Sequence, residues 1–63
     1  MSALKKIRED KGVTKAAMCR HLSISRPTYD VYEEDPRKMR CETAVRAAEF
    51  LNVDPLIFFD QEQ

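Results

Sequence analysis

The residues with recognisable binding chemistry in this chain are basic and hydroxyl side chains between positions 14 and 40. Arg26 opens a predicted helix, and an arginine there is able to grip guanine O6 and N7 in a bidentate fashion. Thr28 is able to bond a phosphate or a base edge, and Val31 is able to touch a thymine methyl group. Pro27 stands between them. Each has an ordinary alternative: an arginine on a phosphate or in solvent, a hydroxyl satisfied at the helix start, and an incidental exposed valine.

A second group of cations flanks this segment. Lys15 stands at the start of the preceding predicted helix, and Arg37, Lys38 and Arg40 lie in a predicted loop after the following one. Lysine and arginine in such places bind phosphates, which positions a protein on a duplex without reading its sequence. The alternative for the loop is an ordinary solvated basic surface.

Two short helices joined by a tight turn must position these side chains. The sequence predicts the first helix over Lys15 to His21 and the second over Arg26 to Glu34. Thr14 and Ser25 stand at the N-cap positions, and Pro27 falls in a first turn, where its missing N–H costs nothing. This layout places a second helix in a DNA major groove.

The rest of the chain also predicts helices, so the fold class is all-α: five short helices in a single domain over residues 1–63. No segment of useful length alternates at period two. The other helices are expected at Ala3 to Lys11 with Ser2 as its cap, at Glu42 to Leu51, and at Pro55 to Phe59. Helical spacing predicts the following inward-facing residues: Leu4, Ile7, Ala17, Met18, Leu22, Tyr29, Tyr32, Cys41, Ala44, Val45, Ala48 and Leu51. In the last segment, Leu56 and Phe59 are expected to face inward together, leaving Ile57 or Phe58 more exposed.

The formal net charge of zero hides an uneven distribution. Residues 1–29 hold seven lysines and arginines against two carboxylates, a net charge of +5, and residues 30–63 carry −5. Such a dipole is able to turn one face toward phosphates. An ordinary solvated charged surface is the alternative.

Several classes of function are disfavoured by what the sequence lacks. It has no nucleophile–base pairing, metal-ligand spacing or glycine-rich phosphate loop, so we expect neither an enzyme nor a cofactor, metal or small-molecule substrate. Cys19 and Cys41 are expected to be buried reduced thiols. There is no apolar run of membrane-spanning length, and MSALKKIRED has no apolar signal-peptide core, so the expected location is cytoplasmic, without membrane contact.

The ordered signals resemble the phage repressor and Cro family, the XRE-type helix-turn-helix domains. The segments that carry the resemblance are Leu4-Lys5-Lys6-Ile7-Arg8, Lys11-Gly12-Val13-Thr14, Ala16-Ala17-Met18, Leu22-Ser23-Ile24-Ser25-Arg26, Tyr32-Glu33, Glu42-Thr43 and Ala48-Glu49-Phe50-Leu51-Asn52-Val53. The resemblance implies a lambda-repressor-like domain with helices 2 and 3 as its helix-turn-helix, acting as a phage- or prophage-type regulator of transcription on double-stranded operator DNA. It also implies an ion pair between Arg8 and Glu33. A weak homodimer is expected through the last helix, at Ile57 and Phe58, with simple capping of the core as the alternative.

Some residues depart from the family pattern. Ser23 stands where glycine is usual, so it must adopt a left-handed conformation or reshape the turn. Asp30, and the apolar Val31 beside it, occupy the presumed reading face. An alternative function is favoured by zero net charge, by apolar Val31 and by the carboxylates around this helix, which are Asp30, Glu33, Glu34 and Asp35. In that alternative, the same fold binds a phage repressor or another protein and modulates its DNA binding.

Overall fold

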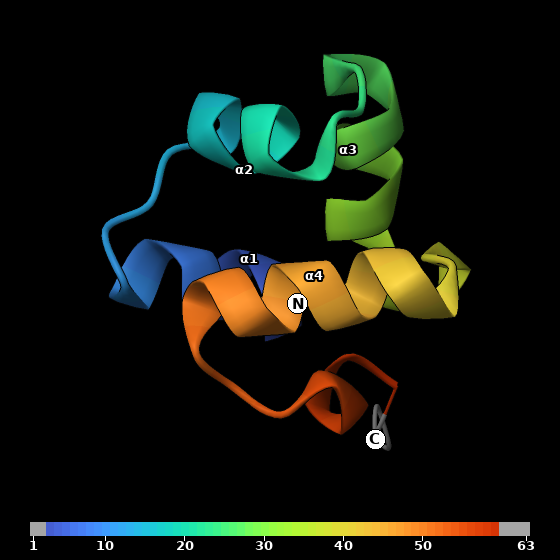
Figure 1. Cartoon of the computed structure of the whole chain (residues 1–63). Helices are drawn as coiled ribbons and strands as arrows, with labels where there is room; N and C mark the ends of the chain where they lie inside the picture. The colour runs from blue at the N-terminus through green and yellow to red at the C-terminus, as the bar shows by residue number, and fades with distance from the viewer. Residues whose placement is uncertain (1–2, 60–63) are drawn as a thin grey trace.

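A computed structural model describes residues 3–59, and helices alone make up the regular structure of that part of the chain (Figure 1). The elements, in chain order, are α1 (Ala3–Asp10), α2 (Lys15–Leu22), α3 (Arg26–Glu34), the 3₁₀ turn η1 (Pro36–Lys38), α4 (Cys41–Leu51) and the 3₁₀ turn η2 (Pro55–Phe58). The helix predicted at Pro55 to Phe59 is therefore wrong in type: four α-helices and two 3₁₀ turns replace the five helices expected. The proposed cap Ser2 lies outside the described residues.

Local capping explains where α2 and α3 begin. The Thr14 hydroxyl oxygen accepts a hydrogen bond from the Ala17 N–H at 3.1 Å, and the Ser25 oxygen accepts one from the Thr28 N–H at 3.4 Å. Pro27 falls at the start of α3, as predicted. Because each cap satisfies a donor that the helix itself leaves open, both helices begin at the predicted residues.

The turn between α2 and α3 depends on the left-handed conformation of Ser23, with φ 57° and ψ 45°. The Ser23 N–H donates to the Arg20 carbonyl at 3.3 Å, and the Ile24 N–H donates to the Cys19 carbonyl at 3.1 Å. These two bonds end α2 and reverse the chain. Serine therefore takes the backbone conformation that glycine adopts without strain, and the helix-turn-helix geometry is kept.

Ten apolar residues form the core between the four helices and η2. They are Leu4, Met18, Leu22, Tyr29, Met39, Ala44, Ala47, Ala48, Leu51 and Phe58. The inward stripe of α4 runs through alanines at positions 44, 47 and 48, so the predicted Cys41 and Val45 fall outside it, and Val45 is 42 % exposed. Cys19 is half-buried and Cys41 is exposed, so the expectation of two buried thiols was wrong.

The side chains of η2 are also arranged differently from the prediction. Phe58 is fully buried, whereas Leu56 is 68 % exposed and Phe59 is 36 % exposed. Residues three apart eclipse one another in a 3₁₀ helix, so Pro55 and Phe58 share the inner side while Leu56 and Phe59 share the outer one. The proposed dimer residue Phe58 is thus part of the core, and Ile57, at 41 % exposure, keeps an accessible side chain.

Candidate nucleic-acid interface

The N-terminal half of α3 presents the side chains that the sequence singled out. Arg26 and Pro27 are exposed, and Val31 is 43 % exposed, so all three are accessible to a partner. Thr28 is half-buried, and its hydroxyl oxygen accepts a hydrogen bond from the Ser25 hydroxyl at 2.9 Å. That contact corresponds to the alternative predicted for Thr28, a hydroxyl engaged at the helix start.

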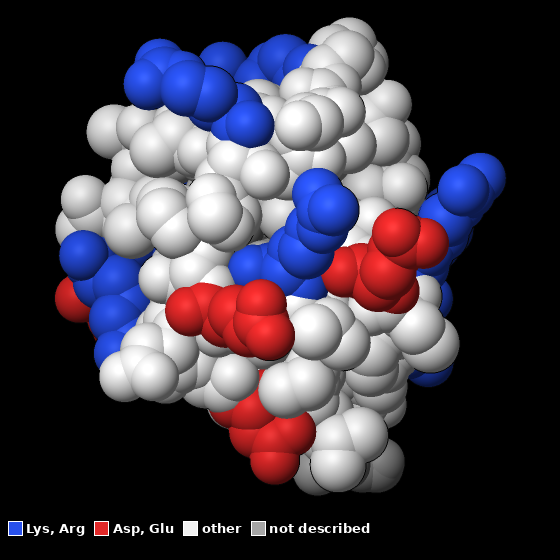
Figure 2. Space-filling model, in the orientation of Figure 1, with Lys and Arg blue, Asp and Glu red and all other residues white. Residues whose placement is uncertain are grey.

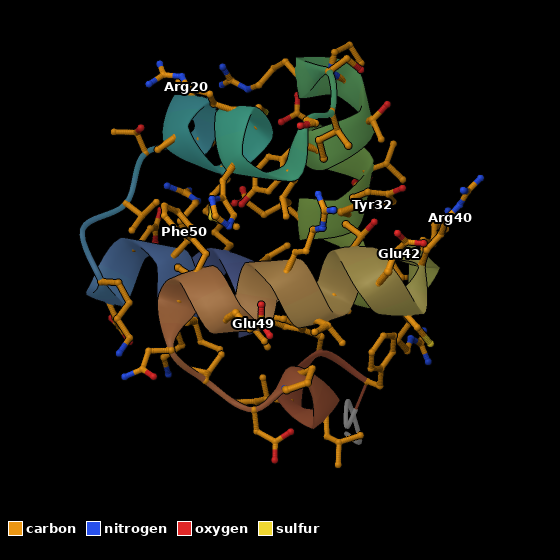
Figure 3. The ribbon with its side chains drawn as sticks, in the orientation of Figure 1. Arg20, Tyr32, Arg40, Glu42, Glu49 and Phe50 are labelled. Atoms are coloured by element: carbon orange, nitrogen blue, oxygen red, sulfur yellow. The ribbon has the colours of Figure 1, made fainter. Side chains whose placement is uncertain are left out.

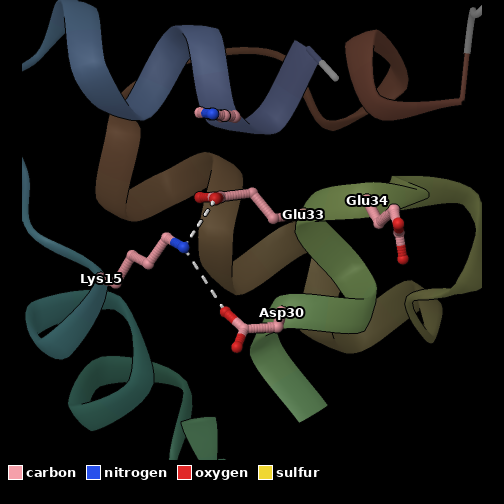
Figure 4. Close-up of a pocket in the computed structure, with 5 residues that line it drawn as sticks. Lys15, Asp30, Glu33 and Glu34 are labelled. Atoms are coloured by element: carbon pink, nitrogen blue, oxygen red, sulfur yellow. Dashed lines mark ion pairs between the residues drawn. The ribbon is translucent and has the colours of Figure 1, made fainter. Parts of the chain in front are cut away.

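Arg26 and Lys15 meet at one carboxylate. The Oδ1 atom of Asp30 lies 3.6 Å from Lys15 Nζ and 3.6 Å from Arg26 Nε. Figure 4 shows Lys15 reaching from the start of α2 to contact both Asp30 and Glu33. From the sequence, Asp30 was noted only as an acidic residue that departs from the family pattern. Its i, i+4 spacing from Arg26 is nevertheless a sequence signal for this ion pair. The contact with Lys15 comes from the packing of α2 on α3.

The ion pair with Asp30 leaves Arg26 accessible to a ligand. The side chains of Arg26 and Asp30 are 57 % and 51 % exposed, and that of Lys15 is 34 % exposed. Exposed pairs contribute only about 0–1 kcal/mol, because water screens the charges and ordering two long side chains is unfavourable. A pair this weak does not prevent Arg26 from turning to a base edge, where a bidentate contact with guanine discriminates against other bases by about 1–3 kcal/mol.

A buried polar cluster fixes α3 against α1. The structure brings Arg8 and Glu33 together: Arg8 Nε donates to Glu33 Oε2 at 2.6 Å, and the Tyr29 hydroxyl donates to the same oxygen at 2.7 Å. A second Arg8 nitrogen donates to the Val13 carbonyl at 2.8 Å. The side chains of Arg8 and Glu33 are only 9 % and 7 % exposed. The cluster therefore sets the angle at which α3 is presented.

The pKa shifts in this cluster follow from its contacts. Burial alone would raise the pKa of the Glu33 carboxyl, but the hydrogen bonds from Tyr29 and Arg8 outweigh it and hold that pKa below 4.5. Burial, reinforced by the hydrogen bond to Glu33, raises the pKa of the Tyr29 hydroxyl above its ordinary value of 10.0. Glu33 is thus a carboxylate, and Tyr29 a neutral donor, at neutral pH.

The basic loop after α3 is only partly available for phosphates. Asp35 Oδ1 accepts hydrogen bonds from the Arg37 backbone N–H at 3.2 Å and from Arg37 Nε at 3.3 Å. The Arg37 side chain, through its hydrogen bond, lowers the pKa of the Asp35 carboxyl. Lys38 and Arg40 are exposed and form no ion pair within residues 3–59, and Figure 3 shows Arg40 extending away from the body of the protein. Lys38 and Arg40 are the accessible cations of this loop.

The face shown in Figure 2 carries an uneven charge. Lysine and arginine side chains gather over α2 at its upper edge, where Figure 3 places Arg20, while both signs mix over α4, which bears Glu42 and Glu49. On the same side of the molecule the Phe50 ring stacks on the His21 ring, with centroids 4.2 Å apart and planes 15° apart. The positive edge therefore belongs to the helix-turn-helix end of this face.

One comparison with known proteins found a match that agrees with this geometry. A family model described as Helix-turn-helix matches residues 4–58, which is most of the chain. No curated protein matches the chain. Residues 3–59 contain no helix long and apolar enough to span a membrane, and they bring together no group of three or more histidine, cysteine or acidic side chains able to hold a metal ion.

Proposed function

Because the chain belongs to the XRE-type helix-turn-helix family of DNA-binding regulators, we propose that it is a Cro- or repressor-like transcription regulator of the kind that phages and prophages use. In this proposal α3 lies in the major groove of operator DNA, with its N-terminal half toward the bases. The observation that carries the proposal is the exposed Arg26 at the start of a capped, rigidly held α3.

Backbone contacts come from the cations on either side. In the sequence, Lys15 stands at the start of α2, and Lys38 and Arg40 follow α3. Phosphate contacts from both sides fix the register of α3 without specifying sequence.

The test is a selection from a randomised duplex library, followed by binding measurements on the enriched duplex. Arg26→Ala is expected to weaken binding to that duplex by about 1–3 kcal/mol and to relax one base position, with little change on random DNA. Arg20→Ala is a matched control, since it removes an exposed arginine from the adjoining helix. If Arg26→Ala loses no more affinity than Arg20→Ala, and loses as much on random DNA as on the enriched duplex, the role of Arg26 is refuted.

A homodimer is part of the same proposal. Its support is the apolar surface of η2 and of Phe59, which follows it: Leu56, Ile57 and Phe59 remain 68 %, 41 % and 36 % exposed. If such a dimer binds operator DNA, its two half-sites are expected to lie about 34–36 Å apart. Sedimentation at high micromolar concentration is expected to reveal a weak dimer that Leu56→Lys abolishes. A wild-type monomer under these conditions would contradict the dimer.

A second candidate function is favoured by Asp30, which engages both Lys15 and Arg26 beside the exposed Val31. A reading face neutralised in this way suits a protein partner, such as a repressor whose DNA binding this chain modulates. Gel shifts with operator-region DNA, with and without that repressor, separate the candidates. Comigration with the repressor and no DNA binding at low salt would support the second candidate over the first.

A further inference from the structure

The Asp30 carboxylate is held from one side and open on the other. Oδ1 makes both ion pairs, with Lys15 and with Arg26, each at 3.6 Å, and neither pair uses Oδ2. Figure 4 shows that second oxygen on the side of the carboxylate away from Lys15. The side chain is 51 % exposed. Asp30 therefore keeps one oriented acceptor that a partner can reach.

The helix places this acceptor beside Arg26. Residues four apart lie on the same side of an α-helix, so Asp30 follows Arg26 along the face that meets the bases in the proposed complex. An ionised carboxylate only accepts hydrogen bonds. Guanine presents two acceptors in the major groove and thymine presents one, whereas cytosine presents the N4 amino donor without an acceptor beside it. The base edge that suits Asp30 is cytosine.

We propose that Asp30 is a second base-reading residue, which accepts a hydrogen bond from the N4 amino group of a cytosine next to the guanine that Arg26 contacts. The inference rests on the proposed function and names its preferred DNA. A cation and an anion 3.6 Å apart on one helix face complement the acceptors of guanine and the donor of a neighbouring cytosine.

The same position also discriminates against other bases. A carboxylate pressed against guanine O6 or thymine O4 faces another acceptor and loses its water without gaining a hydrogen bond. Sequences with an acceptor at this site are therefore bound less tightly than sequences with cytosine. This explains how an acidic residue can serve on a DNA-reading helix.

The experiment compares the wild-type chain, Asp30→Asn and the control Glu34→Gln in selections from the same randomised duplex library. The Glu34→Gln substitution removes the same charge from the same helix. The Glu34 carboxylate points away from Lys15 in Figure 4. Wild type and Glu34→Gln are expected to enrich a guanine with a neighbouring cytosine. Asp30→Asn is expected to keep the guanine and to replace the cytosine with adenine, which an asparagine binds through N6 and N7.

A chemical probe makes the readout specific to one hydrogen bond. In the enriched duplex, the cytosine is replaced by a pyrimidinone nucleotide that lacks the N4 amino group. Wild type is expected to lose about tenfold in affinity, and Asp30→Asn to lose less than about threefold. Thermal melting of each variant checks that the fold is intact, and a merely structural role for Asp30 would not change the preferred base.

Two outcomes would overturn the inference. If Asp30→Asn enriches the wild-type sequence and the amino group makes no difference to wild-type affinity, Asp30 does not read a base, although the proposed function stands. If wild type enriches no sequence and binds no duplex at low salt, the proposed function fails as well.

Discussion

Replacing Glu33 with alanine is expected to remove most of the stability of this domain. The Glu33 carboxylate accepts a hydrogen bond from the Arg8 guanidinium at 2.6 Å and another from the Tyr29 hydroxyl at 2.7 Å. Only 7 % of the Glu33 side chain is exposed. Removing it strands a buried cation and a buried hydroxyl. Breaking a buried pair in this way costs about 3–5 kcal/mol. At roughly 0.05–0.15 kcal/mol per residue, the total stability of a domain this small is about 3–9 kcal/mol.

The assay is urea or thermal unfolding followed by circular dichroism, with Glu34→Ala as the control. Glu34 is exposed on the same helix, so its replacement is expected to change stability by about 0.5 kcal/mol or less. A double variant, Arg8→Leu with Glu33→Leu, removes both charges, and it is expected to recover much of the loss. An unchanged melting temperature for Glu33→Ala, or strictly additive losses in the double variant, would refute the role assigned to this cluster.

The pH dependence supplies a second readout of the same carboxylate. Because the folded-state pKa of Glu33 lies below 4.5, this group contributes stability above pH about 4.5, and the contribution is lost as the pH falls through the folded-state pKa. Wild type is therefore expected to lose stability in acid more steeply than Glu33→Ala. The contribution of Tyr29 to stability changes with pH in the opposite direction. Because its pKa is raised in the folded state, Tyr29 contributes stability below pH about 10, and this contribution is lost as the pH rises through the folded-state pKa. Parallel acid profiles for the two proteins would show that Glu33 does not titrate as described.

The remaining predictions concern the basic loop, the last turn and the cap of α2. Lys38→Ala is expected to weaken binding to all sequences and to lower the slope of log K against log salt by about 1, whereas an effect confined to the enriched duplex would contradict a phosphate contact. Phe58→Ala is expected to cost about 3–5 kcal/mol of stability, much more than Phe59→Ala, and the reverse order in denaturant unfolding would contradict the packing of η2. Thr14→Ala is expected to cost about 1 kcal/mol through the lost cap of α2, and an unchanged urea midpoint would argue against that cap.

Local chemical signals made part of the fold predictable. The predicted bounds of α3, Arg26 to Glu34, agree with the structure, because a serine cap and a first-turn proline define its start. The predicted start of α4 was one residue late, since Arg40 makes no side-chain capping bond there. A four-residue apolar segment does not distinguish an α-helix from a 3₁₀ turn, so both the type of η2 and its inward residue, Phe58, were predicted wrongly.

Tertiary contacts account for what the sequence did not reveal about the candidate site. The meeting of Lys15 with Asp30 and Glu33 depends on how α2 packs on α3, which no local pattern encodes. Met39 is buried although the sequence predicts a polar loop for its segment, because η1 folds this segment back onto the core. The exposure of Arg26 was predictable from its place at the start of α3. Its ion pair with Asp30 was not predicted, and this pair changes how the Arg26 side chain reaches a ligand.

A titration of the chain with its enriched duplex, read by backbone amide NMR shifts, shows which surface of the protein meets the DNA. The largest shifts are expected on residues 25–31, at the start of α3, with a second set at Lys15 and residues 38–40. Shifts confined to α1 and η2, with residues 25–31 unaffected at saturating DNA, would contradict the claim that α3 reads the DNA.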